Sequence, residues 1–175
     1  MKYCAFLRGV NVNGTSMKMA EVCSVFESVG VKEVTSILAS GNILFSSEKD
    51  PAILKSELEK AMSAHFNYEA FLFLRTKDEI ADMTANNPFE LPPDFHTYIF
   101  INLEGVEEEL LQIFKNSEKA IGEKAVVVNG IFYWQVPKGN TLQSAFGKVL
   151  GRKSMKDKLT SRNVNTFVKI SNKFK

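Results

Sequence analysis

The chain has 175 residues, of which 45% are hydrophobic and 24% charged, and its formal net charge is +2. This composition excludes a disordered or fibrous chain and is enough for one ordinary domain or two small ones. No apolar run approaches a membrane span, and the apolar stretch at residues 3–7 is too short for an export signal. We therefore expect a cytoplasmic protein without a membrane partner.

The first 76 residues alternate between strand and helix signals. Apolar runs predict strands at residues 3–8, 34–39, 43–46 and 71–75. Helical spacing of apolar side chains predicts one helix from residue 19 and another after Asp50-Pro51, where Asp suits the N-cap and Pro the first helical position. The predicted order is βαββαβ, which is that of a ferredoxin-like unit.

The second half nearly repeats this order after a connector at residues 77–95, which is a short helix followed by Asn- and Pro-rich turns. A strand at 96–103, a helix from Val106, a hairpin through Asn129-Gly130 and a helix at 141–150 follow. Residues 161–174 fit a strand or a helix, and helix is favoured. The sequence predicts an α+β fold of two tandem ferredoxin-like (βαββαβ-type) units, 1–76 and 96–175, with antiparallel or mixed sheets and helices on one face.

Several short motifs resemble, in the same order, those of one bacterial family. Residues 6–14 (FLRGVNVNG) resemble its LLRGINVGG opening, and residues 40–45 (SGNILF) resemble its SGNVVF segment. Arg75-Thr76, Asn87-Pro88-Phe89 and residues 160–163 (TSRN) are similar to its RT, NPF and TARNW segments, although Val164 replaces the aromatic residue. The chain thus resembles the family called domain of unknown function 1697. That resemblance implies a tandem ferredoxin-like fold and no established activity.

Signatures of known catalytic and metal sites are missing from the sequence. It has no HExxH, GxSxG or GxGxxG motif. Cys4 and Cys23 suit small buried hydrophobic positions, and with only two histidines they cannot complete a zinc site. His65, on a predicted buried stripe, and His96, at the start of a strand, are expected to be structural. We expect no metal and no cofactor, and whether the protein is an enzyme stays open.

One group of candidate site residues follows the first predicted strand. Arg8, Asn11, Asn13 and Gly14 lead toward a helix N-terminus, an arrangement that suits a phosphate or carboxylate. Alternatively, the asparagines satisfy turn backbone and Arg8 pairs with a helix carboxylate. The turn at residues 40–42 is expected to lie at the opposite end of the sheet and to serve only its hairpin.

A second group lies in a basic tail. Residues 148–175 have a net charge of +8, whereas the other 147 residues sum to −6. The candidate phosphate-binding residues of this segment are Arg152, Lys153, Lys158, Arg162 and Asn163. Docking of the tail on the acidic body is an equal alternative. Arg75 completes the candidate set, because convergence of Arg8, Arg75 and Arg162 on one cleft would favour a small ligand.

Three functions remain after these observations. Binding of a small anionic ligand, carrying a phosphate or a carboxylate, is favoured. Nucleic-acid binding through the basic tail is an alternative, but it is not favoured because the paired aromatics Tyr98, Phe100, Phe132 and Trp134 suit a core better than a stacking platform. A structural or protein-interaction module is the third reading. The sequence leaves the oligomeric state open.

Overall fold

The computed structural model describes residues 1–10 and 16–174. The chain divides into two compact units, Met1–Ile80 with Lys169–Lys175, and Ala81–Val168. The last part of the basic tail therefore belongs to the first unit. The assignment of residues 77–95 to a connector and of 96–175 to the second unit concerns independent folding and stays a prediction. No helix of the described part is long and apolar enough to cross a bilayer.

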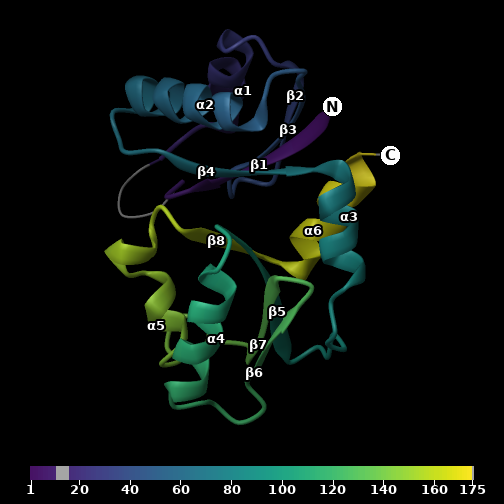
Figure 1. Cartoon of the computed structure of the whole chain (residues 1–175), viewed down its shortest axis with the longest axis vertical. Helices are drawn as coiled ribbons and strands as arrows, with labels where there is room; N and C mark the ends of the chain where they lie inside the picture. Colours follow the sequence, from purple (N-terminus) through teal and green to yellow (C-terminus); the bar gives the residue numbers. More distant parts are fainter. Residues whose placement is uncertain (11–15, 175) are drawn as a thin grey trace. The chain divides into compact units, whose positions relative to one another are not determined.

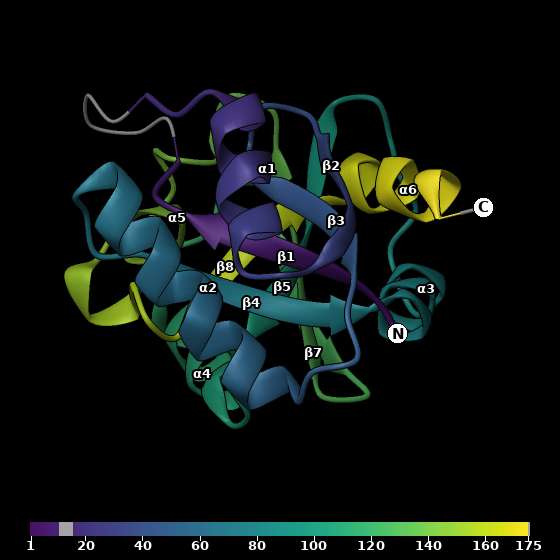
Figure 2. The same cartoon turned by 90° about the horizontal axis from the view of Figure 1, so that it is seen from above.

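The first unit is a four-stranded sheet with two helices on one face, as Figures 1 and 2 show. Its elements are β1 (Lys2–Arg8), α1 (Met19–Ser28), β2 (Lys32–Ile37), β3 (Asn42–Ser46), α2 (Pro51–Phe66) and β4 (Phe71–Thr76). The strand order is β2-β3-β1-β4, and every neighbouring pair is antiparallel. This is the predicted βαββαβ order of a ferredoxin-like unit.

Strand β1 is apolar on both faces, which explains its unbroken run of hydrophobic residues. Tyr3, Ala5 and Leu7 point to the helix-covered face and join the core of the unit. Cys4 and Phe6 point to the other face and are also fully buried. A strand buried on both faces shows no polar alternation, as the sequence of residues 3–7 predicts.

The second unit repeats the architecture. Its elements are β5 (Phe95–Asn102), α4 (Val106–Asn116), β6 (Lys124–Val128), β7 (Ile131–Pro137), α5 (Gly147–Leu150), the 3-10 turn η1 (Lys153–Met155) and β8 (Leu159–Asn163). The strand order β6-β7-β5-β8 corresponds to that of the first unit, again with antiparallel pairs only. Two further helices, α3 (Lys77–Ala85) and α6 (Val164–Lys173), follow the last strands of the two units. The predicted α+β fold of two tandem ferredoxin-like units is confirmed.

The hairpin at Asn129-Gly130 forms as predicted. Both residues have positive φ, 51° and 75°, which a two-residue type I′ turn requires. The aromatic pairs beside it face the helices. Phe100, Phe132 and Trp134 are fully buried in the core of the unit, so they offer no platform for stacking a nucleotide base.

Three local features differ from the predictions. The helix expected at 141–150 is formed only over Gly147–Leu150, because the preceding residues bond within turns, as where Gly147 N donates to Ser144 Oγ at 2.9 Å. Strand β8 was not expected, since its sequence LTSRN carries no apolar alternation and depends on pairing with β5. The favoured helix over the tail is confirmed by α6. His65 is exposed rather than buried, because it falls beside the apolar stripe of α2.

Candidate anion-binding site

The turn at residues 40–42 lies at the carboxyl end of β1, not at the opposite end of the sheet. Because β3 runs antiparallel to β1, its first residue, Asn42, pairs with Phe6. Leu7 N donates to Gly41 O at 2.8 Å, and Asn42 is fully buried, with Nδ2 donating to Ile37 O at 2.9 Å. The expected position of this turn at the opposite end of the sheet is wrong, because the antiparallel direction of β3 brings its first residue to the end of β1.

Arg8 closes β1 at this same end, as expected, and is half-buried. Asn11, Asn13 and Gly14 lie outside the described residues. The anion site predicted for this loop therefore stays a prediction. Among the described residues, the 40–42 turn lies next to the end of β1 that carries Arg8.

Arg8 and Arg75 do not converge within the first unit. Strands β1 and β4 are antiparallel, with Arg8 opposite Phe71 and Arg75 opposite Cys4. The two arginines are on the same face but four positions apart along the strands, which corresponds to about 13 Å. One small ligand could accept a hydrogen bond from both guanidinium groups only if the two side chains extended toward each other along the strands.

Arg75 and Arg162 occupy equivalent places in the two units. Each is the penultimate residue of the last strand, and a helix follows at once. Nη1 of Arg75 donates to Leu74 O at 2.7 Å, and Nη1 of Arg162 donates to Ser161 O at 2.9 Å. Burial lowers the pKa of Arg75. These contacts place both guanidinium groups at a strand-to-helix junction, and a role of either arginine in ligand binding stays a prediction.

The candidate residues of the basic tail lie in different elements of the second unit. Lys158 forms an ion pair with Glu109, with 3.5 Å between Nζ and Oε2, as the internal-docking alternative expects. Arg152 and Lys153 are exposed at the start of η1. Asn163 lies at the other end of β8, at the first turn of α6.

A pocket of about 180 Å³ opens beside Asn163, within the second unit. It is named here the α6 pocket. Its polar lining is His96 and Thr97 from β5, Lys138 after β7, Asn163 at the end of β8 and Asn165 in the first turn of α6. Leu91, Pro92, Pro93 and Phe95 form its apolar side. The pocket thus joins three segments that are far apart in the sequence.

The hydrogen bonds of Asn163 determine which nitrogen of His96 carries the proton. Asn165 N donates to Asn163 Oδ1 at 2.9 Å, which fixes the orientation of the amide. Its Nδ2 then faces His96 Nδ1 at 3.2 Å, and an amide nitrogen can only donate. Nδ1 of the neutral imidazole is therefore the acceptor, and Nε2 carries the hydrogen as a donor.

The polar lining of the α6 pocket combines one cation with neutral side chains that can donate hydrogen bonds. Lys138 is exposed and cationic, and the lining contains no carboxylate. The first backbone N–H groups of α6 add positive potential on the same side. This combination favours an anion over a cation.

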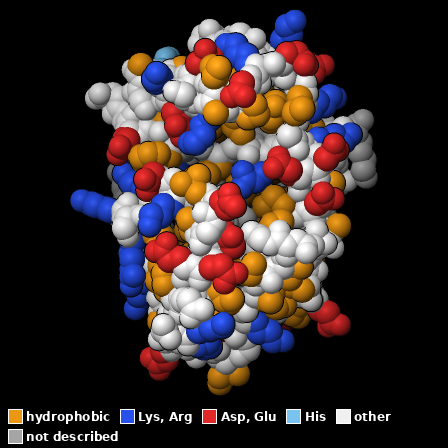
Figure 3. All heavy atoms as spheres, in the orientation of Figure 1, with side chains coloured by type: hydrophobic (Ala, Val, Ile, Leu, Met, Phe, Trp, Pro, Cys, Tyr) orange, Lys and Arg blue, Asp and Glu red, His pale blue; other side chains and the backbone are white. Residues whose placement is uncertain are grey.

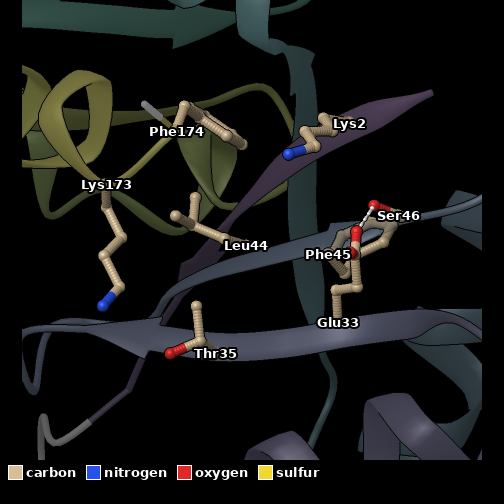
Figure 4. Close-up of a pocket in the computed structure, with 8 residues that line it drawn as sticks. All are labelled: Lys2, Glu33, Thr35, Leu44, Phe45, Ser46, Lys173 and Phe174. Carbon is tan, nitrogen blue, oxygen red and sulfur yellow. Dashed lines mark hydrogen bonds between the residues drawn. The ribbon is translucent and has the colours of Figure 1, made fainter.

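A second pocket, of about 170 Å³, lies along β2 in the first unit and is shown in Figure 4. Lys2 and Lys173 stand on two sides of it, and Leu44 and Phe174 provide apolar surface. Its lining also includes Glu33, whose carboxylate accepts from Ser46 Oγ at 2.5 Å. Because this carboxylate repels an anion, the α6 pocket is the better anion site.

In the described part of the chain, no three His, Cys, Asp or Glu side chains lie close enough together to hold a metal ion. Of the α6 pocket, sequence reasoning found Asn163 alone. It assigned His96 a structural role and missed Lys138. Neither residue belongs to a motif, so only the fold could have indicated their proximity.

Comparison with known proteins identifies the family and supports the fold. The family model "Protein of unknown function (DUF1697)" matches residues 1–133. The chain belongs to the DUF1697 family. A solved structure, that of conserved bacterial protein SP0830 from Streptococcus pneumoniae, is similar at a TM-score of 0.77 and 25% identity, with 99% of this chain and 98% of that chain covered. No curated protein matches. The family model ends within β7, so Lys138 and Asn163 of this DUF1697 protein lie beyond it.

Proposed function

We propose that this DUF1697 protein binds a small anionic ligand, carrying a phosphate or a short carboxylate, in the α6 pocket. The observation that carries the proposal is the convergence of Lys138, His96 and Asn163 on one cavity without a carboxylate in its lining. Lys138 supplies a charge, and His96 Nε2 supplies a neutral donor. Because these three residues are far apart in the sequence, it is the fold that brings them together.

The size of the cavity limits the ligand. At about 180 Å³ the pocket is smaller than the 300–1,000 Å³ typical of drug-sized ligands. An oxyanion with a short apolar group fits this volume, with the oxyanion toward Lys138 and the apolar group toward Pro92 and Pro93. A larger ligand would keep the rest of its structure in solvent.

The test is a thermal-shift and calorimetric series with inorganic phosphate, short carboxylates and nucleoside monophosphates. A ligand at 100 times its Kd stabilises the folded state by about 2.7 kcal/mol, which raises the melting temperature. Lys138→Gln should abolish the shift, whereas Lys124→Gln, which removes an equally exposed charge from β6, should keep it. Equal shifts in both variants, or no shift with any anion, would refute the proposal.

We further infer a cytoplasmic location. Both cysteines, Cys4 and Cys23, are free thiols, as is usual in a reducing compartment. Cell fractionation with a periplasmic marker tests this inference. Recovery of the protein with that marker would contradict it.

A further inference from the structure

Four cations form a separate charged surface on the second unit. Lys148 lies on α5, Arg152 and Lys153 at the start of η1, and Lys156 directly after it. All four side chains are exposed, and they are named here the basic face. In Figure 3, blue side chains project along the left edge of the view, beside the region that Figure 1 labels α5.

The basic face is not neutralised by the protein. Lys158 forms an ion pair with Glu109, but no ion pair among the described residues involves the four cations. Docking on the acidic body therefore does not account for the charges of the basic face. The four remaining charges keep their hydration and counterions until a partner replaces them.

The surroundings of the basic face restrict its partner. Of the apolar residues between the cations, Val149 and Met155 are buried at 1% and 3% exposure, and Leu150 is half-buried and packs against the same core. An anionic membrane or an acidic protein surface usually binds through apolar anchors together with charges. Residues 147–158 contain no aromatic side chain for stacking a base. What remains is a partner recognised through phosphates alone.

The dimensions agree with such a partner. From Lys148 to Lys156 the chain advances eight residues, which is about 12 Å if fully helical and about 27 Å if fully extended. Duplex DNA carries one phosphate per about 1.7 Å of its axis, so several phosphates fall within either length. The acidic remainder of the chain repels DNA, but at 0.1 M salt this repulsion is screened beyond about 10 Å.

We propose that the basic face binds the phosphate backbone of duplex nucleic acid without reading its sequence. This inference is independent of the α6 pocket. If each of the four cations replaces one counterion, the logarithm of the binding constant should fall with a slope of about −3.6 against the logarithm of salt concentration. The binding constant then drops about 150-fold between 50 and 200 mM salt.

The experiment measures fluorescence anisotropy of a short labelled DNA duplex with the full chain over that salt range. One variant replaces the basic face with Gln at Lys148, Arg152, Lys153 and Lys156. The matched control replaces Lys18, Lys32, Lys60 and Lys124, four exposed lysines elsewhere, and so has the same net charge. Circular dichroism verifies that both are folded, and single replacements provide a series should the fourfold variant unfold.

The first variant should lose binding at low salt, and each single replacement should reduce the slope by about one. The control should bind as the unaltered protein does. An equal loss in both fourfold variants would mean that only net charge matters and would overturn the proposal. Absence of DNA binding at low salt would also overturn it, as would a preference for vesicles of anionic lipid over DNA.

Discussion

Replacement of Gly41 by alanine tests whether the 40–42 turn is packed against β1. A Cβ at this position would lie 3.0 Å from Leu7 Cβ and 3.0 Å from Val10 Cγ2, closer than side chains normally approach. Gly41 also has φ of +75°, which costs an L-residue about 1–2 kcal/mol. Overpacking of a core contact adds about 1–3 kcal/mol. Gly41→Ala should therefore lower the free energy of unfolding by about 2–5 kcal/mol.

Gly30→Ala separates the two contributions. Gly30 has φ of +88° and no atom within 4 Å of the added Cβ, so its substitution carries the backbone cost alone. Urea denaturation of both variants gives the difference, which should be about 1–3 kcal/mol in favour of Gly30→Ala. Equal destabilisation of the two variants would refute the close approach of the turn to Leu7 and Val10.

Three further effects are expected on stability. Tyr68→Phe should raise the free energy of unfolding by up to about 1 kcal/mol, because the buried hydroxyl of Tyr68 has no hydrogen-bond partner among the described residues. Tyr133→Phe should lower the free energy of unfolding by about 1 kcal/mol, because Tyr133 OH donates to Met83 O at 2.8 Å. A Tyr68→Phe variant less stable than the unaltered protein would contradict the first expectation. Burial raises the pKa of Tyr68 and of Tyr133 to about 12, from 10.0. The free energy of unfolding should therefore hold below pH 10 and fall as the pH rises toward 12. In urea denaturation at several pH values, the variant with both Tyr68→Phe and Tyr133→Phe should lose less stability over this range. Glu123→Ala should lower the free energy of unfolding by about 1–3 kcal/mol and change the fluorescence emission of the single tryptophan, since Trp134 Nε1 donates to Glu123 Oε1 at 2.9 Å. An unchanged emission spectrum together with an unchanged urea midpoint would contradict this expectation.

Local signals in the sequence were sufficient for most of the fold. Asp50 accepts from Ala52 N and Ile53 N at the start of α2, as a capping residue should, and the Asn129-Gly130 turn adopts its required backbone. Such features depend on neighbours in the chain. Strand β8 depends instead on its pairing partner β5, and its polar sequence gave no local indication of a strand.

The candidate site was much less predictable for the same reason. Asn163 stood out because its segment matches a family motif, whereas His96 and Lys138 belong to other segments and are ordinary residues locally. The assignment of Arg75 as a ligand-binding residue came from a motif and stays a prediction. The structure adds that this arginine is partly buried and that its Nη1 donates to Leu74 O near the strand-to-helix junction.

The most direct test of the α6 pocket is a phosphate titration followed by two-dimensional NMR of the full, isotope-labelled chain. Binding in the pocket should shift the backbone amides of Asn163 and Asn165, the ring resonances of His96 and the Nζ-bearing side chain of Lys138 in a saturable manner. Shifts confined to residues 148–156, or linear shifts without saturation, would contradict a built anion site in this DUF1697 protein.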